Sequence, residues 1–215
     1  METLFFELIQ VSTGQLDCLG RGPEADEWQQ LYHLSKRQHV EGVCYHGVMK
    51  LFEFGLRAPQ DISIDWMAET EDIREKNEQN KKQPLLLRYY DPELQLLRQC
   101  DDDPLRAVPR VTIQQMYQLY KTKKLDMRAV MDYYYTLQKT GGKYETLRGG
   151  GLFSYIGIRR FAAGLMWLLS EHMKLDTKQL PFKPLETEGH YLVSLLFARQ
   201  PVWFEFRHRM AWFQF

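Results

Sequence analysis

The chain has 215 residues, which is enough for one sizeable domain or two small ones with a buried core. Lysine plus arginine and aspartate plus glutamate each total 28, so no net attraction to nucleic acid or to an anionic membrane is expected. The three cysteines (Cys18, Cys44 and Cys100) form neither a CxxC metal motif nor a disulfide framework, which favours a reducing cytoplasm.

Neither a signal peptide nor a membrane span is expected. The first 19 residues are acidic where a signal peptide is basic, and Glu7 and Gln10 interrupt their apolar run. The longest apolar stretch, 161–170, is well short of the roughly 20 residues that a membrane helix needs. It is therefore predicted to be a buried helix.

The first 55 residues predict three helices. Apolar residues recur at helical spacing over 4–11, and Gly14 can end this first helix. A second helix is expected soon after Pro23, with carboxylates in its first turn and Gly42 as its stop. The apolar segment 43–55 is predicted to be the third.

A long helix is predicted to begin after Pro59. Beyond residue 73 it should become a solvated, charged arm that reaches residue 83. Its predicted buried side consists of Ile62, Trp66, Met67 and Ile73.

Residues 84–111 form a proline-rich connector with one short helix and an acidic turn, and at most a small vestigial β element over 84–112. Residues 112–139 predict two helices joined near Lys123. Five glycines in the eleven residues of 141–151 indicate a flexible loop, after which a last helical block begins at residue 156.

The fold predicted from these elements is mainly α, a multi-helix bundle of two helical blocks. The blocks are 1–83 and 112–215, and they are expected to pack as one domain across the connector 84–111. Because of the segment 84–112, an α+β fold is the alternative.

Two groups of carboxylates have both a metal-binding and a structural interpretation. Asp61 and Asp65 stand four residues apart, which is one turn of a helix, whereas ligands on a strand are favoured two apart. Helix capping and solvation are the preferred interpretation for this pair. Asp101–Asp103 precede Pro104 and are expected to form a solvated turn.

Two further clusters have a structural and a binding interpretation. A basic group near the predicted helix junction could grip phosphate, but a solvated helix face is the preferred interpretation. It consists of Lys121, Lys123, Lys124 and Arg128. Tyr133, Tyr134 and Tyr135 cannot all face one way on a helix, so some are expected in the core and some in water. The core stripe of that helix is predicted to be Met127, Val130, Met131, Tyr134 and Leu137.

Common catalytic motifs are missing from the sequence. The glycine-rich stretch 147–157 has neither GxGxxG spacing after a strand nor a following Lys-Ser/Thr pair, so it is interpreted as a linker. No GxSxG elbow is present, and the histidines form no HxxxH or HExxH pair. They are His33, His39, His46, His172, His190 and His208.

Two parts of the chain resemble a known family. The N-terminal stretches 4–14, 26–51 and 57–83 resemble the N-terminal helical region of a bacterial family, frequent in gut Bacteroidetes, of uncharacterised nucleotidyltransferases. The stretches 125–139 and 156–197 resemble that family's C-terminal helical region. Together the resemblance covers about two-thirds of the chain.

The resemblance implies a mixed α/β catalytic core between the two regions, with a Gly-Asp-X-Asp strand that holds magnesium against a nucleoside triphosphate. This sequence has no such motif, and no catalytic, nucleotide-binding or metal-ligating residue is assigned. Without paired carboxylates, nucleotidyl transfer loses its main electrostatic stabilisation. A natural deletion and an unrecorded central region both remain open.

The sequence is therefore compatible with two functions. One is a nucleotidyltransferase-like protein by family resemblance that lacks the catalytic core in this chain. The other is a non-catalytic helical interaction module, with a protein partner or self-association through the aromatic C-terminus. The aromatic residues of that terminus are Trp203, Phe204, Phe206, Trp212, Phe213 and Phe215.

Overall fold

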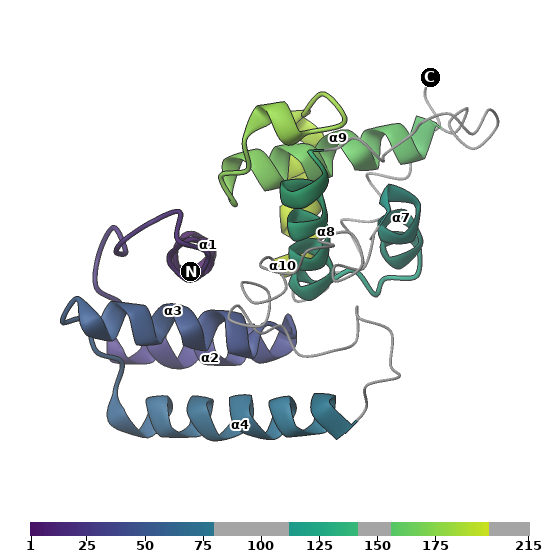
Figure 1. Ribbon diagram of the computed structural model, residues 1–215. Helices are drawn as coiled ribbons and strands as arrows, with labels where there is room; N and C mark the ends of the chain where they lie inside the picture. The colour runs from purple at the N-terminus through teal and green to yellow at the C-terminus, as the bar shows by residue number, and fades with distance from the viewer. Residues whose placement is uncertain (80–111, 142–155, 198–215) are drawn as a thin grey trace.

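The computed structural model describes residues 1–79, 112–141 and 156–197 (Figure 1). These residues form eight α-helices and one short 3₁₀ helix, and no strand occurs among them, so the predicted mainly α fold is confirmed. The proposed β element, the connector helix, the acidic turn at 101–103 and the aromatic C-terminus lie outside the described residues.

Four helices make up the first block and four α-helices the second. The first block contains α1 (Glu2–Thr13), α2 (Ala25–Arg37), α3 (Glu41–Glu53) and α4 (Gln60–Gln79). The second contains α7 (Ile113–Lys121), α8 (Met127–Thr140), α9 (Ile156–Glu171), the 3₁₀ helix η3 (Thr177–Gln179) and α10 (Glu186–Phe197).

In the first block, α2 and α3 lie between α1 and α4 (Figure 1). Helix α1 approaches α3 closely because Gly47 has no side chain: a Cβ there would lie 2.6 Å from the carbonyl oxygen of Leu8. On the other side, Tyr32 of α2 donates a 2.6 Å hydrogen bond to Glu69 of α4. Trp66 of α4 is fully buried beneath this contact.

In the second block, α8 is the central helix. Every one of its residues from Met127 to Leu137 is buried, so the predicted core stripe is confirmed. Helices α9 and α10 pack tightly at two glycines, since a Cβ on Gly164 would lie 2.7 Å from the carbonyl oxygen of Glu188. A Cβ on Gly189 would collide with the ring of Trp167.

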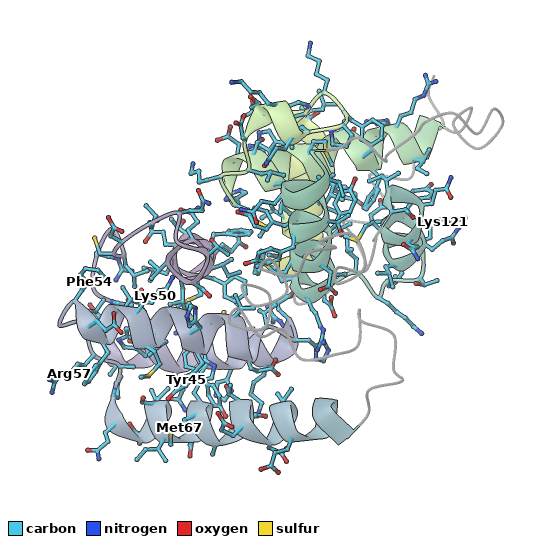
Figure 2. All side chains as sticks on the ribbon, in the orientation of Figure 1. Tyr45, Lys50, Phe54, Arg57, Met67 and Lys121 are labelled. Atoms are coloured by element: carbon cyan, nitrogen blue, oxygen red, sulfur yellow. The ribbon has the colours of Figure 1, made fainter. Side chains whose placement is uncertain are left out.

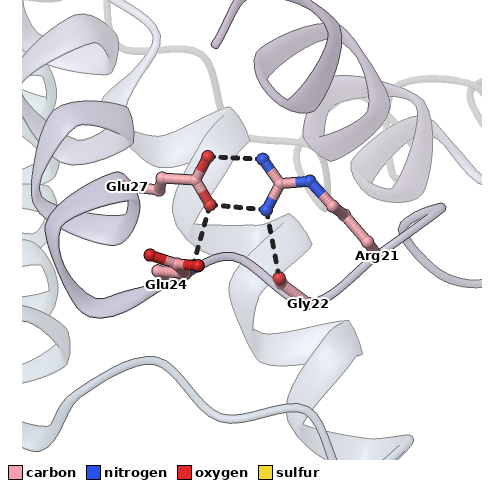
Figure 3. Close-up of polar contacts among 4 residues, drawn as sticks. All are labelled: Arg21, Gly22, Glu24 and Glu27. Carbon is pink, nitrogen blue, oxygen red and sulfur yellow. Dashed lines mark hydrogen bonds and ion pairs between the residues drawn. The ribbon is translucent and has the colours of Figure 1, made fainter.

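Local sequence signals explain several helix ends. Gly14 and Gly141 end α1 and α8 with φ of 75° and 55°, the left-handed conformation that glycine adopts without strain. At the start of α2 the backbone N–H of Glu24 donates to the carboxylate of Glu27 at 2.9 Å, and Arg21 also binds that carboxylate (Figure 3). Asp126 caps α8 through the N–H of Ala129 at 2.9 Å.

Three details of the prediction are wrong. Gly42 does not stop α2, which ends at Arg37; Gly42 lies buried in the first turn of α3. Met67 was expected in the core but is 46% exposed, because α4 buries only the narrow side that carries Ile62 and Trp66. No member of the tyrosine triplet 133–135 is in water, since α8 is covered all round.

The two blocks meet through aromatic rings. Phe197, the last residue of α10, makes edge-to-face contacts with Phe5 and Phe6 of α1, at centroid distances of 5.4 and 5.3 Å. His172 stacks on Phe6 at 4.2 Å, and its carbonyl oxygen accepts a 2.7 Å hydrogen bond from Gln10. The first helix of the chain is therefore anchored on the last described one.

Candidate functional site

The carboxylate pair considered for metal binding lies in water. Asp61 and Asp65 are both exposed on α4, on a helix as their spacing of four predicts. Within residues 1–79, 112–141 and 156–197, no group of three or more His, Cys, Asp or Glu side chains is arranged to hold a metal ion. His208 lies outside these ranges.

The four basic residues near the helix junction do not form one cluster. Lys121, Lys123 and Lys124 are exposed around the end of α7, and Lys123 has a φ of 58° at the turn where the junction was predicted. Arg128 is instead buried, with 8% of its surface exposed. A single phosphate-gripping group is therefore not assembled from these residues.

Arg128 belongs to a polar junction between the two blocks, at which Gln38 makes the central contacts. The Gln38 side chain accepts a 3.0 Å hydrogen bond from the N–H of Met127 and donates a 2.6 Å bond to the carbonyl oxygen of Leu196. The backbone carbonyl oxygen of Gln38 accepts a 3.3 Å hydrogen bond from the backbone N–H of Arg128. One side chain at the end of α2 thus joins the start of α8 to the end of α10.

Charged groups surround this junction. Burial lowers the pKa of Arg128, although the nearby carboxylates of Asp132, Asp126 and Glu41 favour its charged form. Burial likewise raises the pKa of both Glu41 and Asp126, against the attraction of Arg128 and His39. Arg128 thus faces three carboxylates, Asp132, Asp126 and Glu41, so the group around it has no surplus positive charge with which to hold an anion.

The raised pKa of Glu41 predicts a pH dependence of stability. Because the folded-state pKa lies above the ordinary value of 4.5, the folded protein binds more protons, and this contribution to stability is lost as the pH rises through the folded pKa. Glu41→Gln cannot titrate, so its stability relative to the parent should improve between pH 4 and pH 8. Urea unfolding at several pH values measures the difference in stability between the variant and the parent. A difference that stays constant with pH would mean that the pKa of Glu41 is not raised by folding.

A shallow hollow lies on the second block. It is lined by Tyr120, Phe161, Glu188, Tyr191 and Leu192, and its volume of about 10 Å³ holds roughly one water molecule. Ligand pockets usually measure several hundred Å³. The hollow is therefore much too small for a nucleotide.

The most exposed apolar side chains of the first block gather on α3, α4 and the turn between them. The exposed fractions are 45% for Met49, 50% for Phe52, 66% for Phe54, 51% for Ile64 and 46% for Met67. Figure 2 labels Met67 on α4, Phe54 at the turn, and Tyr45 between the two helices. We call the following six residues the α3–α4 apolar surface: Tyr45, Met49, Phe52, Phe54, Ile64 and Met67.

Helical spacing aligns the members of this surface on each of the two helices. Tyr45, Met49 and Phe52 stand at positions i, i+4 and i+7 of α3, and therefore follow one stripe along the helix. Ile64 and Met67 are three apart on α4, the neighbouring helix. Sequence reasoning missed this surface, although α3 contains more apolar residues than one buried stripe can use.

Comparison with protein-family models, with curated proteins and with solved structures gives no match. No helix among the described residues is long and apolar enough to cross a membrane. What the chain does therefore has to be inferred from its own side chains.

Proposed function

We propose that the described helices form a protein-interaction module that binds through the α3–α4 apolar surface, in a chain that is nucleotidyltransferase-like by descent. The observation that supports the module is the exposure of five large apolar side chains, each at 45% or more, on one helical hairpin. Scattered apolar residues are normal on a protein surface, whereas a gathered patch of this kind is typical of a binding site.

The rest of the first block is packed well enough to hold this surface rigid. Beneath it, Trp66 and Leu51 are completely buried. Lys50 donates hydrogen bonds of 3.3 and 3.1 Å to the carbonyl oxygens of Val11 and Ser12, which caps the end of α1. A rigid platform loses little conformational entropy when a partner binds.

Photo-crosslinking in the host cell tests the interaction function. A photoreactive amino acid at position 49 should form covalent adducts with another protein when the cells are irradiated. The matched control is position 185, because Leu185 is also 45% exposed but lies on the second block. Equal adduct formation at both positions, or none at position 49, would argue against a binding role for the surface.

The second candidate is nucleotide transfer with magnesium and a nucleoside triphosphate, which rests on the resemblance of the two blocks to the regions that flank a catalytic sheet. In its support, Gln10 and Gln38 bond directly across the two blocks, so the two regions that carry the resemblance pack against each other. The metal-binding carboxylates would have to come from further residues or from a partner.

Calorimetry distinguishes this candidate from the first. Titration of the chain with ATP and magnesium should give heat that disappears when EDTA removes the metal, if the chain retains a triphosphate site. Absence of heat at millimolar ATP would leave the interaction module as the function of this chain.

A further inference from the structure

We infer that the polar junction between the two blocks is a pH-sensitive contact, which is tight in mild acid and loosens as Glu41 and Asp126 ionise. The first block supplies Glu41 from the start of α3, and the second supplies Asp126 and Arg128 from the start of α8. Gln38 bonds across the boundary between them. The contact is therefore a place where ionisation can act on the arrangement of the two blocks.

The carboxyl of Glu41 lies in a poorly solvated place. Only 8% of the residue is exposed, and the indole N–H of Trp66 on α4 donates a 3.1 Å hydrogen bond to its backbone carbonyl oxygen. Cys44, three residues further along α3, is completely buried, and its thiol stays protonated because burial raises its pKa. A carboxylate in such a place gives up much of its hydration.

Charged groups face Glu41 from several elements. Arg128 of α8 and His39 in the turn before α3 favour the ionised carboxyl, whereas Glu69 of α4 opposes it. Glu69 is itself paired with Lys36 at 2.7 Å, which weakens its influence. Burial has the largest effect and raises the pKa of Glu41 in spite of the two cationic side chains.

Asp126 adds a second titratable carboxyl to the junction. It is half-buried and caps α8 by accepting a 2.9 Å hydrogen bond from the N–H of Ala129. Burial raises its pKa against the attraction of His39 and Arg128. Arg128 must also serve Asp132, and its Nε has no hydrogen-bond partner in the part of the chain that the structure describes. One guanidinium is thus shared among carboxyls of both blocks.

The sign of the pH effect follows from burial. A carboxyl whose folded pKa is raised contributes stability that is fully present below its ordinary pKa and is lost as the pH rises through the folded pKa. Opening of the junction returns water to Glu41 and Asp126, so the open form is favoured once they ionise. The junction should therefore be tighter at pH 5 than at pH 8.

Hydrogen exchange at two amides reports the opening directly. The N–H of Met127 donates to the Gln38 side chain and the N–H of Arg128 to the Gln38 backbone carbonyl oxygen, so both bonds cross between the blocks. Their protection, corrected for the intrinsic effect of pH on exchange, should fall about threefold or more from pH 5 to pH 8. The N–H of Gly141, bonded at the opposite end of α8, is the control and should change little.

Isosteric variants identify the titrating groups. Glu41→Gln cannot ionise, so protection at Met127 and Arg128 should vary less with pH than in the parent. Adding Asp126→Asn, which retains a helix-capping side chain, should remove the remaining variation. Glu53→Gln is the matched control, because Glu53 is exposed on the same helix as Glu41, and it should leave the pH profile unchanged.

Three results would overturn the inference. Protection at Met127 and Arg128 could be equal at the two pH values or could rise with pH, which would mean that ionisation does not open the junction. An equal loss of protection at Gly141 would mean that the whole chain responds. A full pH dependence in the double variant would assign the titration to other groups.

Discussion

Trp66→Ala should lower the free energy of unfolding by about 3–5 kcal/mol, the usual cost of deleting a buried tryptophan. The indole of Trp66 is completely buried, its centroid lies 5.4 Å from the ring of Tyr32, and its N–H donates a 3.1 Å hydrogen bond to the carbonyl oxygen of Glu41. Its removal leaves a cavity between α4 and the α2–α3 pair. Urea unfolding followed by circular dichroism measures the loss.

Met67→Ala is the matched control, one position along the same helix. Because Met67 is 46% exposed, its truncation should change stability by no more than about 0.5 kcal/mol. Amide exchange over residues 60–73 should accelerate in the Trp66 variant and not in the Met67 variant. Similar stabilities for both variants would mean that α4 is not held by its tryptophan.

Gln38→Ala should lower the free energy of unfolding by about 2–5 kcal/mol, because two backbone groups lose their partner at a buried junction. The N–H of Met127 and the carbonyl oxygen of Leu196 both bond to the Gln38 side chain. A buried polar group without a partner costs about 1–3 kcal/mol. Chemical denaturation with fluorescence detection gives the difference.

Gln30→Ala provides the comparison for Gln38, since Gln30 is exposed on the same helix and should contribute less than about 0.5 kcal/mol. The junction variant should also loosen the contact between the blocks, which amide exchange at residues 127–131 would detect. An unchanged exchange rate there, together with unchanged stability, would rule out the proposed role of Gln38.

The described helices could be predicted from the sequence because their signals are local. Apolar periodicity, Gly14 after α1 and the turn near Lys123 each depend on a few neighbouring residues. The exposure of Met67 and the burial of all three residues of 133–135 could not be predicted, since they depend on how many helices surround α4 and α8. Helix propensity and apolar periodicity do not reveal how many other helices will surround a given helix.

The polar junction escaped prediction for a related reason. Gln38 binds groups 89 and 158 residues further along the chain, and nothing in the sequence near position 38 distinguishes it from a solvated glutamine. Arg128 is close in sequence to three exposed lysines, yet the fold buries it. Sites made by distant segments need the tertiary structure.

Methionine oxidation tests most directly whether the α3–α4 apolar surface is open to a partner. Dilute hydrogen peroxide should oxidise Met49 and Met67 rapidly, and Met1 as well, because these three are 38–46% exposed. The buried methionines should react slowly; they are Met116, Met127, Met131, Met166 and Met173. Oxidation of Met49 and Met67 as slow as that of the buried methionines would contradict the proposed binding surface.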